Sequence, residues 1–181
     1  MNSATKNLEN DHVHILRLID VMERATKAES PDVNHLELMV DLIKSFADGF
    51  HHAKEETLLF PLLVEKGFSL EQGPVGVMLN EHVQGRNYVK GMAENIALYK
   101  TGNQNALPLI YQNMNGYISL LRNHINKENN ILFKMADRVL TENDHETLLH
   151  QYGEIDTHNI CGGDLNQCLS KIETLAKAYN V

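Results

Sequence analysis

Two segments of this chain combine imidazole and carboxylate groups with apolar residues in the same order. The first segment, 51–61, holds two histidines and two glutamates within six residues and ends in Leu58-Leu59-Phe60-Pro61. In the second segment, His124 and Glu128 are followed by Ile131-Leu132-Phe133. Imidazole and carboxylate together are a typical ligand set for iron, manganese or zinc. The two segments therefore predict a metal site that lies between two separate parts of the fold.

The spacing of apolar residues predicts helices along most of the chain. A helical period favours four long amphipathic helices over residues 8–27, 33–64, 74–99 and 105–140. Short turns that contain proline or glycine separate these stretches. Two shorter helices are expected after them, one from 141 to about 155 and one over 165–179, with a loop at 159–164. Long helices with short connections predict an all-α fold, an up-down-up-down four-helix bundle with additional short C-terminal helices.

This pattern divides the chain into three parts. Residues 1–7 are expected to be a flexible N-terminal tail, because they are polar and precede the first apolar stripe. Residues 8–140 form the predicted bundle. Residues 141–181 form a C-terminal helical extension that packs on the bundle or contributes to a homodimer contact, and the sequence leaves these alternatives open.

Composition narrows the classes of partner. A chain of 181 residues is long enough for one domain with a sizeable core. Its net charge of −8 argues against nucleic acid, which needs a surplus of lysine and arginine. No apolar run approaches the ~18 residues that would span a bilayer, and the N-terminus lacks the apolar core of a signal peptide. We therefore expect a cytoplasmic protein with no membrane partner.

Glutamate follows histidine by four residues at four places in the chain. The pairs that are able to bind a buried metal are those on the apolar face of a helix. Residues four apart on a helix are neighbours and can reach one metal ion. Two of the pairs share a row with leucine, isoleucine or methionine, and two share a row with polar residues. The apolar rows contain His52/Glu56 and His124/Glu128, and the polar rows contain His51/Glu55 and His150/Glu154.

Two further histidines, His12 and His82, fall on the apolar faces of the first and third predicted helices. Six buried polar residues from four helices would cost several kcal/mol each without partners, and a metal removes that cost. The alternative is a polar core that is satisfied by hydrogen bonds alone. Six ligands are too many for one tetrahedral zinc and suit two metal ions bridged by carboxylates. The predicted ligands are His12, His52, Glu56, His82, His124 and Glu128.

Iron is the expected metal, by analogy with other carboxylate-bridged bundles, and ligand type alone also permits manganese or zinc. The segments that contain Asp11-His12, 51–61, Glu81-His82 and 124–133 resemble those of hemerythrin-like (HHE cation-binding) domains. The resemblance covers about residues 8–138. It implies a four-helix bundle with a non-haem di-iron centre, the same six ligands, and Glu56 and Glu128 as bridges.

One position departs from the family pattern. The resemblance to oxygen-carrying hemerythrins implies a second histidine on the third helix, four residues from His82, where this chain has Met78 and Arg86. One iron is therefore expected to lack an imidazole and to take water, or a carboxylate such as Glu81 or Glu55, in its place. Arg86 is expected either at the surface or in a hydrogen bond to a ligand carboxylate.

The resemblance implies a non-haem di-iron protein that binds, senses or reacts with oxygen or a related small ligand such as nitric oxide or peroxide, or that handles iron. The alternative is a di-iron enzyme that acts on nitric oxide or peroxide. Such an enzyme would need an external electron donor, because the chain shows no flavin or nucleotide motif. A third hypothesis is a structural bundle without metal, and no residue is assigned a catalytic role.

Overall fold

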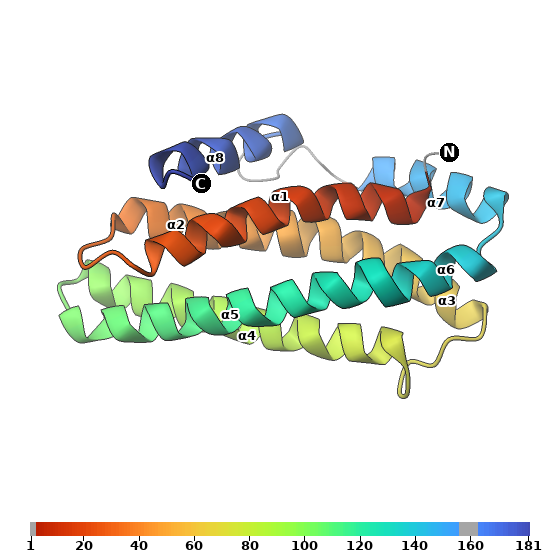
Figure 1. Cartoon of the computed structure of the whole chain (residues 1–181), viewed down its shortest axis with the longest axis horizontal. Helices are drawn as coiled ribbons and strands as arrows, with labels where there is room; N and C mark the ends of the chain where they lie inside the picture. Colours follow the sequence, from red (N-terminus) through yellow and green to blue (C-terminus); the bar gives the residue numbers. More distant parts are fainter. Residues whose placement is uncertain (1–2, 156–162) are drawn as a thin grey trace.

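The computed structural model describes residues 3–155 and 163–181. Four helical rods lie side by side along the long axis of the molecule, and successive rods run in opposite directions (Figure 1). No described residue lies in a β-strand. The predicted all-α bundle is therefore confirmed. In chain order the rods are α1 (Ala4–Ala25); α2 (Val33–Leu42), η1 (Ile43–His52), η2 (Glu55–Leu59) and α3 (Phe60–Glu65); α4 (Pro74–Lys100); and, after the short turn η3 (Gln104–Ala106), α5 (Leu107–Lys127), η4 (Glu128–Leu132) and α6 (Phe133–Val139).

Three segments of the second and fourth rods are π-helical, with backbone hydrogen bonds that span five residues instead of four. The Phe60 N–H donates to the Glu55 carbonyl in η2, and the Phe133 N–H donates to the Glu128 carbonyl in η4. The third segment, η1, ends at His52. Such segments are rare and occur frequently at functional sites. All three carry histidines or glutamates of the predicted metal site or its neighbours.

The first helix begins earlier than the sequence pattern predicted. Ser3 caps α1 by accepting a hydrogen bond from the backbone N–H of Lys6. The Thr5 hydroxyl donates to Asp137, and Ala4 is completely buried. The expectation of a flexible tail over 1–7 is thus wrong for residues 3–7, because the serine cap and this contact with α6 hold them in the bundle. Residues 1–2 lie outside the described part of the chain.

The C-terminal extension consists of α7 (Glu142–Glu154) and α8 (Leu165–Ala178). A capping box starts α7, since Thr141 and Asp144 exchange hydrogen bonds. Figure 1 shows α7 beside the start of α1, and α8 along α1 and α2. Ile172 and Leu175 of α8 are buried in the core of the bundle. Most of the loop predicted at 159–164 lies outside the described residues.

Two apolar clusters fill the interior on either side of a polar layer. The larger one gathers side chains from α1, α2, η1, α4, α5 and α8, including Phe46, Met92 and Ile110. The smaller one lies toward the start of α1 and includes Phe60 and Phe133, which directly follow the π-helical segments η2 and η4. Burial of one such side chain contributes about 1.5–3 kcal/mol, so these clusters stabilise the rods that carry the polar layer.

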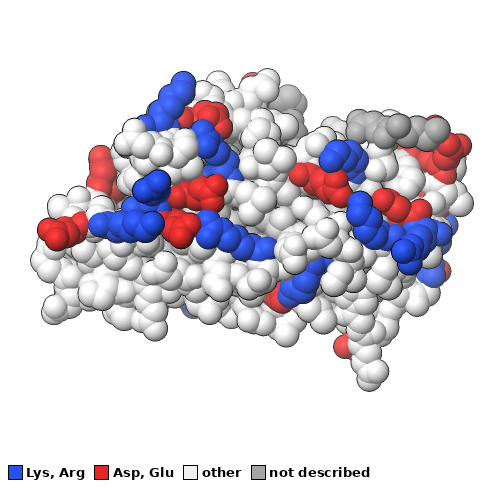
Figure 2. Space-filling model, in the orientation of Figure 1, with Lys and Arg blue, Asp and Glu red and all other residues white. Residues whose placement is uncertain are grey.

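The surface is unevenly charged. Figure 2 shows lysine, arginine, aspartate and glutamate interspersed over the upper part of the view, whereas the lower part, over α4 and α5, carries few of them. Residues 101–121, which include the first half of α5, contain no charged side chain. None of the helices in 3–155 or 163–181 is long and apolar enough to cross a bilayer.

Candidate metal centre

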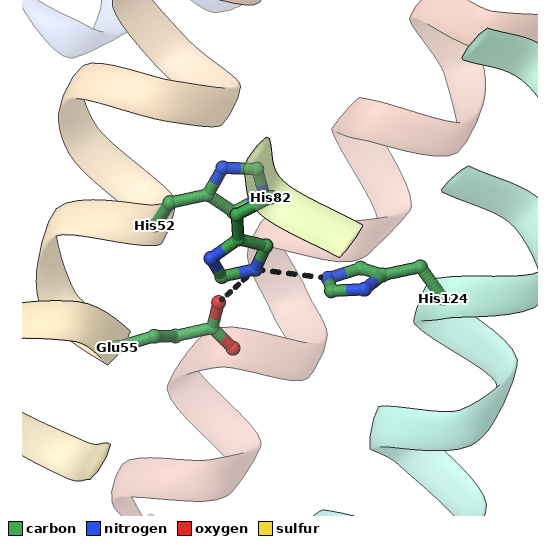
Figure 3. Close-up of side chains that lie close together, drawn as sticks. All are labelled: His52, Glu55, His82 and His124. Atoms are coloured by element: carbon green, nitrogen blue, oxygen red, sulfur yellow. Dashed lines mark hydrogen bonds and ion pairs between the residues drawn. The ribbon is translucent and has the colours of Figure 1, made fainter. Parts of the chain in front are cut away.

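Five histidines and two glutamates form a buried polar layer in the middle of the bundle. Their donor atoms fall into two groups, and within each group these atoms lie within 4.8 Å of one another. The two-histidine group contains His12, His51, Glu55 and Glu128. The three-histidine group contains His52, Glu55, His82 and His124, which reach the site from three different rods (Figure 3). No member of either group is more than 6% exposed.

The two carboxylates lie between the two groups. Glu128 places Oε2 3.2 Å from His12 Nε2 and Oε1 3.2 Å from His124 Nε2. Glu55 Oε2 lies 3.7 Å from His51 Nε2 and 3.5 Å from His82 Nε2. Each carboxylate therefore contacts one histidine of each group, as a bridging ligand must.

The imidazole nitrogens converge in the same way. His12 Nε2 lies 2.9 Å from His51 Nε2, and His82 Nε2 lies 3.1 Å from His124 Nε2. The His52 ring stacks on His82, with 3.8 Å between the ring centroids. Like groups held this close in a dry interior repel or compete for a proton, which makes a cation between them favourable.

The four oxygens of Glu55 and Glu128 are fully buried and make no hydrogen bond of ordinary geometry, although histidine Nε2 atoms lie 3.2–3.7 Å from three of them. A buried carboxylate without a donor is costly, and native proteins almost always pair such groups or place them on a metal. The donor set of five imidazoles and two carboxylates suits a borderline divalent ion. These residues therefore fit the metal ions that the sequence predicted.

Every imidazole of the site has an acceptor for its other ring nitrogen. Such acceptors fix the ring orientation and the tautomer, so that Nε2 is left for the metal. The Nδ1 partners are Asn129 for His12 at 2.7 Å, Asp11 for His51 at 3.3 Å, Asp48 for His52 at 3.2 Å, Glu56 for His82 at 2.7 Å and Glu81 for His124 at 3.0 Å.

Burial sets the protonation of the metal-free site. It lowers the pKa of His51 to about 4 and that of His52 to about 3, so both rings are neutral at pH 7. Burial, together with the charge of Glu128, raises the pKa of Glu55 well above its usual range. Burial also opposes protonation of His124, but the carboxylates of Glu128 and Glu81 outweigh it and raise the pKa of His124 to about 9.

Five of the six predicted ligands, His12, His52, His82, His124 and Glu128, enter the two groups. Glu56 does not, because its carboxylate accepts hydrogen bonds from His82 Nδ1 and from Arg86 outside them. Glu55 instead belongs to both groups.

The face assigned to the pair His51/Glu55 was also wrong, since the two side chains are 1% and 0% exposed. In a π-helix each residue turns less about the axis than the α-helical period assumes. Over η1 this shortfall accumulates and brings His51 inward beside His52.

The sequence does contain a signal for His51 and Glu55. Glu55 precedes Leu59-Phe60 by the same spacing as Glu128 precedes Leu132-Phe133. When the two segments are aligned so that Leu59-Phe60 matches Leu132-Phe133, Glu55 pairs with Glu128 and His51 pairs with His124.

The same change restores the imidazole that the third helix lacks. With His51 added to the four predicted histidines, the two groups together hold five, and His52 joins His82 and His124 in one of them. Glu81, which was considered as a substitute ligand, instead accepts from His124 Nδ1. Arg86 donates to Asp48 at 2.9 Å and to Glu56 at 2.8 Å, and these carboxylates are the acceptors for His52 and His82. Arg86 thus holds the groups that orient two of the three histidines.

Two adjacent glutamates on the second rod provide a direct test of this geometry. Glu55→Gln removes a charge that lies between the two groups, so we expect loss of at least one bound metal ion per chain. Glu56→Gln changes a carboxylate that lies outside the two groups and contacts His82 and Arg86, so we expect full occupancy with about 10- to 100-fold weaker affinity. Metal content after dialysis measures the difference. Retention of metal by Glu55→Gln together with its loss in Glu56→Gln would restore the original assignment.

Metal loading at pH 7 should release protons. His124 is protonated below its raised pKa of about 9, and the raised pKa of Glu55 favours its neutral form, but both groups must be deprotonated as ligands. We expect at least about one proton per chain, from His124, with a smaller release above pH 9, where His124 is already neutral. Calorimetric titrations with a divalent metal in buffers of different ionisation enthalpy measure this number. Identical enthalpies in all buffers would contradict it.

Arg86→Gln should weaken metal binding about tenfold, because Asp48 and Glu56 lose the cation that holds them against His52 and His82. Arg122 is a matched control: it also bridges two carboxylates, Asp20 at 2.7 Å and Glu23 at 2.6 Å, away from the site. The two arginine side chains are similarly exposed, at 42% and 39%. Equal metal affinities of Arg86→Gln and Arg122→Gln, measured by competition with a chelator, would remove this role.

Curated relatives of the chain include the "Iron-sulfur cluster repair protein YtfE" of Yersinia pestis (strain Pestoides F) and of Yersinia pseudotuberculosis serotype O:1b (strain IP 31758). Each is 36% identical over 91 residues, which cover 49% of this chain and 41% of the relative. The match thus spans less than half the length of these relatives. No solved structure matches the chain.

A family model covers most of the chain. The hemerythrin HHE cation-binding domain matches residues 3–136, which run from the cap of α1 into α6 and include both groups of ligands. The family's cation-binding character agrees with the orphaned carboxylates and converging imidazoles of the polar layer. The chain belongs to the hemerythrin HHE cation-binding domain family.

Proposed function

We propose that this chain binds two iron ions in the polar layer and uses them to bind or react with a small ligand such as oxygen, nitric oxide or peroxide. His12 and His51 would hold one ion, and His52, His82 and His124 would hold the other. Glu55 and Glu128 would bridge the two ions. Iron held in this way can change oxidation state when such a ligand binds.

One observation carries the proposal: the four oxygens of two facing carboxylates are buried among five imidazoles and make no hydrogen bond of ordinary geometry. A polar core satisfied by hydrogen bonds alone would leave no such oxygens. Two ions rather than one are supported by the division of the donor atoms into two groups that share Glu55. Iron is supported by the imidazole and carboxylate donors and by relatives whose name refers to iron-sulfur clusters.

The sequence predicted that one iron lacks an imidazole ligand. His51, which was not among the predicted ligands, brings the number of histidines in the two groups to five. Reversible ligand binding and turnover of nitric oxide or peroxide therefore both stay open, and turnover would need an external electron donor.

A second candidate function is iron handling in iron-sulfur cluster repair. The observation that favours it is the similarity to relatives that carry this name, over 91 residues. In that case the centre would give up its metal to an acceptor protein instead of holding it through cycles of ligand binding. Cytoplasmic location and a homodimer contact through the C-terminal extension are further parts of the proposal.

The protein purified without oxygen should contain two iron ions per chain. We expect a new absorption band when nitric oxide or oxygen is admitted, because an added ligand changes the iron environment. A band that reverses on removal of the gas indicates binding, and steady consumption of gas with an electron donor indicates an enzyme. Iron loss to a metal-free iron-sulfur protein, without such a band, would favour iron handling. One iron or none per chain would contradict the di-iron proposal.

A further inference from the structure

A pocket of about 280 Å³ opens onto the three-histidine group between η1, α4 and α5. His52, His82 and His124 line its inner end, whereas no ligand that belongs to the two-histidine group lines it. Aromatic rings lie against two histidines of the site. Phe60 stacks on His82 with 6.0 Å between centroids, and Phe133 stacks on His12 at 5.7 Å. The pocket therefore gives access to one of the two groups.

The size and walls of this pocket exceed what a diatomic ligand needs. A cavity of ~150 Å³ lined by apolar side chains is enough to bind benzene. Here the apolar wall is formed by Ile43, Val89, Ala93, Tyr117, Leu120 and Leu121. Pockets of roughly this volume with mainly apolar walls and a few polar groups are typical of small organic ligands.

Most of the charges that line the pocket are already paired. Arg86 pairs with Asp48, Lys90 with Glu94 at 3.9 Å, and Glu81 with His124 and Lys127. Lys44 also lines the pocket, and no ion pair of Lys44 is found within the described part of the chain. The ammonium group of Lys44 at the wall and a metal ion at the inner end both favour an anionic group on the ligand.

We infer that this pocket binds a small carboxylic acid with an apolar ring, whose carboxylate faces the three-histidine metal or Lys44 and whose ring lies against the apolar wall. The anion preference rests on the proposed function, because it needs the metal. The apolar ring preference rests on the walls alone. Such a ligand would fill the pocket in front of the three-histidine group.

Calorimetric titration of the iron-loaded protein with benzoate and with acetate tests the inference. Benzoate should bind at least about tenfold more tightly, because its ring leaves water for the apolar wall. Ala93→Phe should fill the pocket and remove this advantage. Ala97→Phe is the matched control, since Ala97 lies one turn further along α4, is exposed and does not line the pocket. Ala93→Leu replaces the phenylalanine variant if circular dichroism shows a loss of helix.

The cation has its own test. Lys44→Gln should weaken benzoate binding about threefold or more and leave the neutral probe benzyl alcohol unaffected. An equal loss of affinity for both probes would show that Lys44 does not bind the carboxylate. Equal affinities for benzoate and acetate would overturn the inferred site. So would an equal loss of benzoate affinity in Ala93→Phe and Ala97→Phe.

A titration of metal-free protein with benzyl alcohol separates failure of the inferred pocket from failure of the di-iron proposal. This probe needs only the apolar wall. Binding that is lost in Ala93→Phe but kept in Ala97→Phe supports the pocket even if no iron is found in the protein. No binding of benzyl alcohol to the metal-free protein would overturn the pocket, whatever its iron content.

Discussion

Two carboxylates that face each other without hydrogen bonds of ordinary geometry place the strongest demand on this fold. Glu55 and Glu128 are fully buried, and each contacts histidines of both groups. Two such charges cannot both remain ionised in a dry interior unless a cation lies between them. In its absence the pKa of Glu55 rises and His124 takes up a proton. The apolar clusters on either side must therefore supply the stability that allows this polar layer to persist.

The π-helical segments explain how a bundle of ordinary amphipathic helices can hold so many ligands at one level. In η1 the wider turn brings His51 and His52, which are adjacent in sequence, to two different metal groups. In η2 and η4 it places Glu55 and Glu128 one turn before the phenylalanines that cover His82 and His12. A straight α-helix would turn His51 or His52 away from the site.

The bundle could be predicted from sequence because its signal is simple. Apolar residues at helical period, separated by proline and glycine, marked all four rods and the two later helices to within a few residues. The site was harder. His12, His82, His124 and Glu128 follow the α-helical rows, but Glu55 and His51 do not, because the π-helical segments shift the rows. The start of α1 was missed because polar residues such as Thr5 carry no apolar helix signal. The hydrogen bond from Thr5 to Asp137 is visible only in the structure.

The central claim is that two ions share Glu55 and Glu128, with two histidines on one ion and three on the other. Anomalous X-ray diffraction at the iron edge, from crystals of the iron-loaded protein, tests this most directly. The account predicts two iron peaks per chain, one beside His12 and His51 and one beside His52, His82 and His124. A single peak, or a peak coordinated by Glu56 in place of Glu55, would contradict it.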